Sequence, residues 1–193
     1  MNYCSHCGAE IVEKVPSDDN RLRHVCVACE RVHYQNPKII TGCIPVLDDR
    51  ILLCKRAIEP RLGFWTLPAG FMELGETTQQ AAIRETMEEA NAEVDQLRLY
   101  TMFNLPHVNQ VYMIFLARLL NEDFSAGAES QEVELYKEQD IPWGEMAFKV
   151  IKHTLHCFYA DRERGGYRLH TGDIVRTADS YEFVPGLKTP ADD

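Results

Sequence analysis

Hydrophobic side chains recur along this chain with the spacing of strands in most places and with the spacing of a helix in two. Residues 39–46 and 51–56 are rich in aliphatic and β-branched side chains, and a polar turn at 47–50 separates them. This pattern predicts a β-hairpin. Further strands are predicted over residues 97–103, 111–119 and 133–136.

The clearest helical signal covers residues 77–91. Thr77 and Gln80 have the spacing of a capping box, in which the hydroxyl and the amide satisfy free backbone groups at a helix start. The hydrophobic stripe of this helix, predicted to pack on the sheet, consists of Ile83, Met87 and Ala90. A second helix is predicted from Trp143, Phe148, Ile151, Leu155 and Phe158.

The order of these elements is strands, helix, strands, helix, which indicates an α+β fold around a mixed sheet. A length of 193 residues predicts one main core with a small appendage. Residues 34–37 end in Asn-Pro, a pair that favours a turn. We therefore predict a small module at 1–36, a main domain at 37–180 and a tail at 181–193.

Composition and charge narrow the class of protein. No apolar run approaches the roughly 20 residues that cross a bilayer, so no membrane partner is expected. The N-terminus has no basic segment followed by an apolar stretch, which predicts a cytoplasmic location. The net charge of −10 disfavours nucleic acid as a partner. It also means that an anionic substrate needs a local cation.

Four cysteines form two C-x-x-C pairs, Cys4 with Cys7 and Cys26 with Cys29. Each pair can sit on a tight turn that directs two thiolates to one point, and four thiolates complete the tetrahedral shell of Zn²⁺. Such a site leaves no position for substrate, so the predicted role of zinc is structural. Zinc would also supply folding energy that so short a segment lacks.

Two alternatives remain open for this module. A redox dithiol expects a single C-x-x-C beside a βαβ pattern, and a histidine, His6 or His24, could replace one cysteine as a ligand. The other three cysteines, Cys43, Cys54 and Cys157, are interpreted as small apolar residues.

Three acidic residues of the first predicted helix, Glu85, Glu88 and Glu89, are spaced i, i+3 and i+4. This spacing places their side chains together on one face. Two unit charges about 4 Å apart repel by about 4 kcal/mol at an effective dielectric near 20, so a divalent cation would stabilise the cluster. A solvated acidic helix face is the alternative.

The residues around this cluster resemble the Nudix box. Gly70, Glu76 and the run 84–89 (Arg-Glu-Thr-Met-Glu-Glu) fall at its fixed spacing. Residues 65–70 (Trp-Thr-Leu-Pro-Ala-Gly) are similar to the usual entry into the box. The match is specific because one glycine, one arginine and four glutamates all fall at set positions.

Two positions depart from the Nudix pattern. Thr86 stands where an aliphatic residue is usual, and Asn91 replaces the glycine that ends the helix. Asn91 is predicted to keep the left-handed conformation of a helix end, and the Thr86 methyl can still pack. The box is therefore expected to be functional.

The resemblance implies an α/β/α sandwich with a catalytic site for Mg²⁺ or Mn²⁺. The implied metal ligands are the carbonyl of Ala69 and the carboxylates of Glu85, Glu88 and Glu89, and such hard cations prefer oxygen ligands.

Supporting roles are implied by the same resemblance. Arg84 would orient a glutamate, and Glu76 would brace the loop. Glu132 is favoured as general base, followed by Glu129, and Glu85 is a further alternative. A solvated loop is the opposite interpretation of the acidic stretch at 129–134.

Two Nudix branches that carry a zinc ribbon are similar to this chain: the NADH diphosphatases and the plant-type FAD/ADP-ribose diphosphatases. The second fits better, because residues 102–107 (Met-Phe-Asn-Leu-Pro-His) differ from the Ser-Gln-Pro-Trp-Pro-Phe-Pro type motif of the first. Hydrolysis of ADP-ribose or FAD to AMP plus ribose 5-phosphate or FMN is therefore predicted. An NADH diphosphatase, a silent nucleotide-binding regulator and a zinc-ribbon nucleic-acid module are the alternatives.

The substrate is expected to meet basic and aromatic side chains. Arg56 and Arg61 are candidates for phosphate contacts, together with Lys55, and a solvated basic loop is the alternative. Trp65 is a candidate for stacking on adenine, as are Tyr34, Phe64 and Phe103, with core positions as the alternative. A homodimer is implied by resemblance alone.

Overall fold

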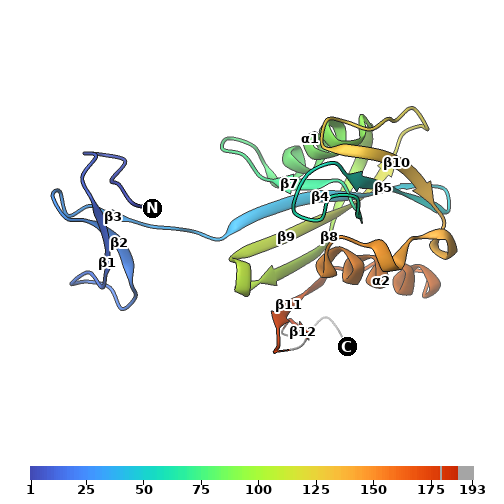
Figure 1. Ribbon diagram of the computed structural model, residues 1–193. Coiled ribbons are helices and arrows are strands. Elements are labelled where there is room, and N and C mark those ends of the chain that lie inside the picture. Colours follow the sequence, from blue (N-terminus) through green and yellow to red (C-terminus); the bar gives the residue numbers. More distant parts are fainter. Residues whose placement is uncertain (179, 187–193) are drawn as a thin grey trace. The chain divides into compact units, whose positions relative to one another are not determined.

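The computed structural model describes residues 1–178 and 180–186, and the chain divides into two compact units, Met1–Pro37 and Lys38–Asp193 (Figure 1). We call them the ribbon unit and the main unit. The ribbon unit is a three-stranded antiparallel sheet in the order β1-β2-β3. Its strands are β1 (Ile11–Lys14), β2 (Arg23–Cys26) and β3 (Val32–His33).

The main unit contains a nine-stranded sheet in the order β10-β5-β4-β9-β8-β11-β12, with β6 beside β5 and β7 beside β4. Strands β4 and β9 are parallel, as are β8 and β11, whereas the other pairs are antiparallel. The predicted mixed sheet is therefore confirmed. The strands are β4 (Lys38–Leu47), β5 (Arg50–Arg56), β6 (Trp65–Thr66), β7 (Ala69–Phe71), β8 (Val94–Leu105), β9 (Gln110–Leu119), β10 (Ser130–Tyr136), β11 (His170–Arg176) and β12 (Tyr181–Pro185).

Two helices, α1 (Thr78–Ala90) and α2 (Lys149–Glu163), cover opposite faces of this sheet (Figure 1). Successive strand residues point to opposite faces, so Ile44 packs in the cluster that contains Leu155 of α2, and Cys43 packs in the cluster that contains Ala82 of α1. The predicted α/β/α sandwich is confirmed. Three short 3-10 helices lie in the connections, Pro106–Val108, Glu138–Asp140 and Trp143–Glu145.

The local sequence signals account for most of these elements. Val46 pairs with Ile51 in the predicted hairpin, and the other predicted strands lie within β8, β9 and β10. Helix α1 begins at a capping box in which Thr77 and Gln80 bind each other's backbone N–H groups, and it ends at Asn91 with a φ of 46°. Both predictions about the helix ends are confirmed.

The predicted hydrophobic stripe of α1 is wrong. Ile83 and Met87 are 41% and 39% exposed, and only Ala90 of the three is buried. The buried face consists of Ala81, Ala82, Glu85, Thr86, Glu89 and Ala90. Small alanines let the helix approach the sheet closely, so the helix turns its glutamates inward and its larger apolar side chains outward.

The C-terminal part contains strands that the sequence analysis did not predict. Helix α2 carries Ile151, Leu155 and Phe158 as predicted, whereas Trp143 lies in the preceding 3-10 helix. After it, β11 pairs with β8 and β12 pairs with β11. Residues 181–185, which the sequence placed in a tail, thus form β12, and 187–193 lie outside the described residues. Strand β11 is mostly polar and β12 has only five residues, so their hydrophobic pattern is weak.

No helix among the described residues is both long enough and apolar enough to cross a bilayer.

Candidate metal-binding active site

The candidate site lies where α1 faces the short strand β7. Strand β7 pairs with β4 through Gly42 opposite Ala69 and Thr41 opposite Gly70. A Cβ atom on Gly42 would lie 2.3 Å from both the Ala69 Cβ and the Pro68 carbonyl oxygen, so only glycine permits this approach. The Ala69 N–H then donates to Glu89 Oε2 at 3.2 Å.

Gly70 leaves room for the carboxylate of Glu85. A Cβ atom on Gly70 would lie 2.2 Å and 2.5 Å from the two carboxylate oxygens of Glu85. The Glu85 carboxylate therefore rests directly on the backbone of β7, and the residue is only 9% exposed. This contact explains physically why the residue at position 70 has no side chain.

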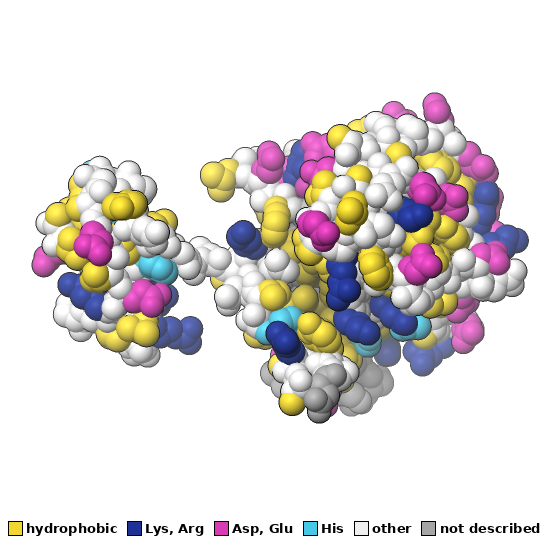
Figure 2. Space-filling view, in the orientation of Figure 1, with side chains coloured by type: hydrophobic (Ala, Val, Ile, Leu, Met, Phe, Trp, Pro, Cys, Tyr) yellow, Lys and Arg dark blue, Asp and Glu magenta, His cyan; other side chains and the backbone are white. Residues whose placement is uncertain are grey.

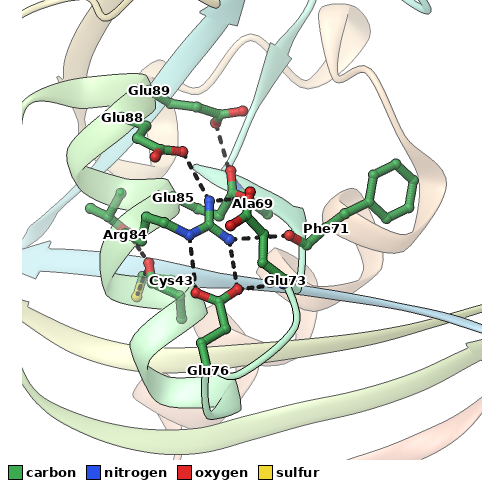
Figure 3. A network of polar contacts seen from close by, with 11 residues as sticks. Cys43, Ala69, Phe71, Glu73, Glu76, Arg84, Glu85, Glu88 and Glu89 are labelled. Atoms are coloured by element: carbon green, nitrogen blue, oxygen red, sulfur yellow. Dashed lines mark hydrogen bonds and ion pairs between the residues drawn. The ribbon is translucent and has the colours of Figure 1, made fainter.

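Arg84 holds the acidic residues in place through five N–H···O contacts (Figure 3). Its Nε and one terminal nitrogen bind the two oxygens of Glu76 at 3.0 and 2.8 Å. The other terminal nitrogen binds Glu85 at 2.8 Å and Glu88 at 2.9 Å. The fifth contact is to the Phe71 carbonyl. Since a guanidinium has five donors, every donor of Arg84 is used.

Burial makes the charged state of the inner glutamates unfavourable. Burial raises the pKa of Glu89 to about 8. The charge of Glu85 raises this pKa further, whereas the hydrogen bond from the Ala69 N–H lowers it. Burial also raises the pKa of Glu85, although the hydrogen bond and the charge of Arg84 lower it. In contrast, the hydrogen bonds from Arg84 lower the pKa of Glu76. The negative charge of the two buried carboxylates is thus not fully balanced by its surroundings, and a divalent cation would balance it.

The donor set suits a hard cation, but its members are not equally placed. Within residues 1–178 and 180–186, only the four N-terminal cysteines bring three or more potential ligand atoms within 4.8 Å of one another. Glu85 and Glu89 face β7, whereas Glu88, with a side chain 59% exposed, is turned to Arg84. Glu85 and Glu88 share one terminal nitrogen of Arg84, and the three carboxylates do not converge on one point among the described residues.

The two candidate bases are placed differently. Glu132 on β10 forms an ion pair with Lys55, with an Nζ–Oε1 distance of 2.8 Å. Glu129 precedes β10, and its charge contributes to the raised pKa of both Glu85 and Glu89. The structure thus brings Glu129, the second choice from the sequence, into electrostatic contact with the site.

The three residues predicted to meet substrate, Trp65, Arg61 and Arg56, have different surroundings in the structure. Trp65 is 4% exposed and packs edge-on against Tyr136 with ring centroids 5.2 Å apart, which is the core position left open as an alternative. The guanidinium of Arg61 lies 5.6 Å from the Phe64 ring centroid. Arg56 acts on the glutamate site, because its positive charge lowers the pKa of Glu89.

A segment that the sequence analysis did not single out caps the C-terminal end of α1. The Gly127 N–H donates to the Glu89 carbonyl at 3.0 Å, and the Ser125 N–H donates to the Ala90 carbonyl at 2.9 Å. A Cβ atom on Gly127 would lie 1.8 Å from the Glu88 carbonyl oxygen. This packing joins residues far apart in sequence, so no local pattern announces it.

The four cysteines of the ribbon unit converge as predicted. The Sγ atoms of Cys7 and Cys26 are 3.4 Å apart, and those of Cys4 and Cys29 are 3.8 Å apart. Tetrahedral zinc with Zn–S bonds of about 2.3 Å requires roughly this spacing. The histidine at the cluster is His33, whose Nε2 lies 3.3 Å from Cys4 Sγ.

The two histidines considered as alternative ligands have no place in this cluster. Among the described residues, the group of converging ligand atoms holds cysteines alone, and neither His6 nor His24 belongs to it. His24 lies instead 3.7 Å from a carboxylate oxygen of Glu13.

Comparisons with known proteins agree with this division of the chain. Residues 37–155 match the family described as NUDIX domain, and residues 2–35 match the one described as Nudix N-terminal. A NUDIX hydrolase of known crystal structure from Nitrosomonas europaea is 51% identical and superposes with a TM-score of 0.88. The match covers 91% of this chain and 100% of that one.

More distant relatives have named activities. NAD-capped RNA hydrolase NudC of Edwardsiella ictaluri is 32% identical over 79% of this chain and 60% of its own length. The same enzyme of Escherichia coli O9:H4 (strain HS) is 32% identical over 83% and 63%. This chain thus spans about three fifths of the length of these relatives. An ADP-ribose pyrophosphatase from Streptococcus suis (23% identity, TM-score 0.58, 70% of this chain and 99% of that one) shares the fold.

Proposed function

Because the chain belongs to the NUDIX family of hydrolases, we propose that it hydrolyses the diphosphate of a nucleotide substrate with a divalent cation at Glu85, Glu88 and Glu89. The observation that carries this proposal is the burial of two carboxylates against the backbone of β7, Glu85 over Gly70 and Glu89 on the Ala69 N–H. Buried like charges without a cation are costly.

Magnesium or manganese would be held by these three carboxylates and the Ala69 carbonyl, and when bound it would lower the pKa of a water and stabilise charge on the diphosphate. Arg84 orients Glu85 and Glu88 through its terminal nitrogens, and Glu76 fixes Arg84. The proton released by the water passes to a carboxylate. Glu129 suits this step better than Glu132, because Lys55 already holds Glu132, and Glu85 is the further alternative.

ADP-ribose or FAD is the proposed substrate. The water oxygen forms a bond to one phosphorus, the bridging P–O bond of the anhydride breaks, and the products are AMP plus ribose 5-phosphate or FMN. A structural Zn²⁺ on the four cysteines, a cytoplasmic location and a homodimer are further predictions for this chain.

An NAD-type substrate is the second candidate. It is favoured by the 32% identity to proteins named NAD-capped RNA hydrolases, although residues 102–107 differ from the motif expected of the NADH branch. All these substrates share an AMP unit joined through a diphosphate. NAD-capped RNA as substrate would overturn the prediction that no nucleic acid is a partner.

The test is a substrate panel of ADP-ribose, FAD, NADH, NAD-capped RNA and diadenosine polyphosphates with Mg²⁺ and product analysis. Glu88→Gln and Glu89→Gln should each lower kcat more than about a hundredfold, since even outer-shell partners of a metal ligand are worth about 10–100-fold. Glu93→Gln, an exposed glutamate just after α1, is the matched control. No turnover of any diphosphate by the wild type would favour the silent regulator.

A further inference from the structure

A groove lies between α2 and the β11–β12 hairpin of the main unit. It encloses about 260 Å³, slightly below the roughly 300–1,000 Å³ of ordinary ligand pockets. Strands β11 and β12 lie beyond residue 155, where the match to the NUDIX domain ends. One wall of the groove therefore lies outside the residues that match the NUDIX domain.

The wall formed by α2 is basic. It consists of Lys149, Lys152, His153 and His156. Glu182 is the only acidic side chain among the described residues that line the groove. Figure 2 shows lysine, arginine and histidine side chains gathered on one part of the main unit. In a chain with a net charge of −10, the two lysines of this wall complement a phosphate group. Lys152 also donates to the Trp143 carbonyl at 3.0 Å.

The opposite wall is aromatic and apolar. The ring centroids of Phe183 and His153 are 4.0 Å apart, and Tyr181 is 43% exposed. Beside the groove, Trp143 stacks on His156 with centroids 4.5 Å apart and planes 5° from parallel. Partly exposed aromatic rings of this kind accept another flat ring.

His153 adds a polar group that is not satisfied. Its Nε2 atom is buried and has no hydrogen-bond partner among residues 1–178 and 180–186. Buried polar atoms are nearly always paired, so His153 is an exception in the wall of the groove.

The basic wall begins close to the glutamate site. Phe148 caps the start of α2, next to Lys149, and the Arg56 guanidinium lies 5.2 Å from the Phe148 ring centroid. The same Arg56 acts electrostatically on Glu89. Arg56 therefore contacts the residue that precedes the basic wall and also acts on the glutamate site.

We propose that this groove binds a nucleoside monophosphate unit, with the base against Tyr181 and Phe183 and the phosphate against Lys149 and Lys152. Two sources supply such a unit. It is either the half of the diphosphate substrate that extends away from the carboxylates, which rests on the proposed function, or a separate free nucleotide.

Calorimetric titration of the zinc-loaded protein with AMP, without added Mg²⁺, tests the proposal. Under these conditions the glutamate site repels phosphate. Lys149→Gln and Tyr181→Ala should each weaken AMP binding by roughly tenfold, the value of one lost charged or stacking contact. Lys14→Gln, an exposed lysine of the ribbon unit, and Glu93→Gln, which changes an exposed carboxylate, should bind like the wild type. Millimolar AMP that fails to bind, or equal binding by Lys149→Gln and Lys14→Gln, overturns the proposal.

The KM of a hydrolysed substrate identifies the source. If the unit belongs to the substrate, Lys149→Gln raises KM by a similar factor and leaves kcat unchanged. If the unit is a free nucleotide, AMP binding still depends on Lys149 while KM does not. Should the protein hydrolyse no diphosphate, the proposed function fails, but the AMP titration still decides whether the groove binds a nucleotide.

Discussion

The two clusters of metal-ligand residues in this chain are built in opposite ways. In the ribbon unit, four Sγ atoms lie within 4.8 Å of one another, and each pair of cysteines comes from a four-residue turn. In the main unit, three glutamates share one helix, yet Glu88 is turned to Arg84 while Glu85 and Glu89 face β7. The first cluster is closed and local, and the second is open and assembled from distant parts.

The difference lies in what positions the ligands. The cysteines are positioned by their own turns, where the Cys29 N–H donates to Cys26 Sγ at 3.4 Å. The glutamates are positioned by backbone approaches that only glycine allows, at Gly42, Gly70 and Gly127. The open site therefore depends on residues that contribute no ligand atom.

Gly70→Ala should break the open site most severely. The new Cβ atom would occupy the space of the Glu85 carboxylate, at 2.2–2.5 Å from its atoms, and the flexible side chain would be displaced. Since a shift of about 1 Å in a catalytic group can cost about a hundredfold, we expect kcat to fall by about that factor with the fold retained. Steady-state turnover and far-ultraviolet circular dichroism measure the two effects.

Gly144→Ala is the matched control for this substitution. A Cβ atom on Gly144 meets no described atom within 4 Å, so turnover should stay at the wild-type level. If both variants were equally active, the close contact between position 70 and Glu85 would have no catalytic importance.

The local parts of both clusters were predictable from the sequence, because capping boxes, C-x-x-C turns and carboxylates one helical turn apart depend on near neighbours. The buried face of α1 was not predictable from the sequence. A hydrophobic pattern places Ile83 and Met87 inside, but the helix buries Glu85 and Glu89 instead. Only the approach of β7, and of Gly127 from beyond β9, explains that orientation. Strands β11 and β12 were missed because their pairing, not their hydrophobicity, defines them.

Cys26→Ser tests the closed cluster. Loss of one thiolate should reduce bound zinc from one ion per chain to nearly none and unfold the ribbon unit, whose core is small and includes Cys26 itself. Turnover should stay within about twofold of wild type, since a closed four-cysteine site has no position for substrate. Zinc content, proteolysis of residues 1–37 and turnover are measured together. A large loss of turnover with an intact main unit would assign the ribbon a role in catalysis.

The smallest expected effect is a pH dependence of metal stabilisation. The pKa of Glu89 is raised from 4.5 to about 8 by burial, so the folded protein holds a proton that the unfolded chain releases between these values. Without metal, this group lowers the free energy of unfolding as the pH rises from about 4.5 to about 8, and its full cost, on the order of a few kcal/mol, is present above that range. A bound cation offsets the cost.

Mg²⁺ should therefore raise the Tm of the main unit by several degrees more at pH 8.5 than at pH 6, because one kcal/mol corresponds to about 2–4 °C in a protein of this size. Glu89→Gln removes the buried charge, so it should raise the Tm without metal at pH 8.5 and abolish most of the Mg²⁺ effect. Glu93→Gln, which changes an exposed carboxylate, should show the wild-type pattern. An Mg²⁺ shift independent of pH in the wild type would mean that Glu89 is already ionised in the empty site, and that Arg56 and the Ala69 N–H suffice to hold its charge.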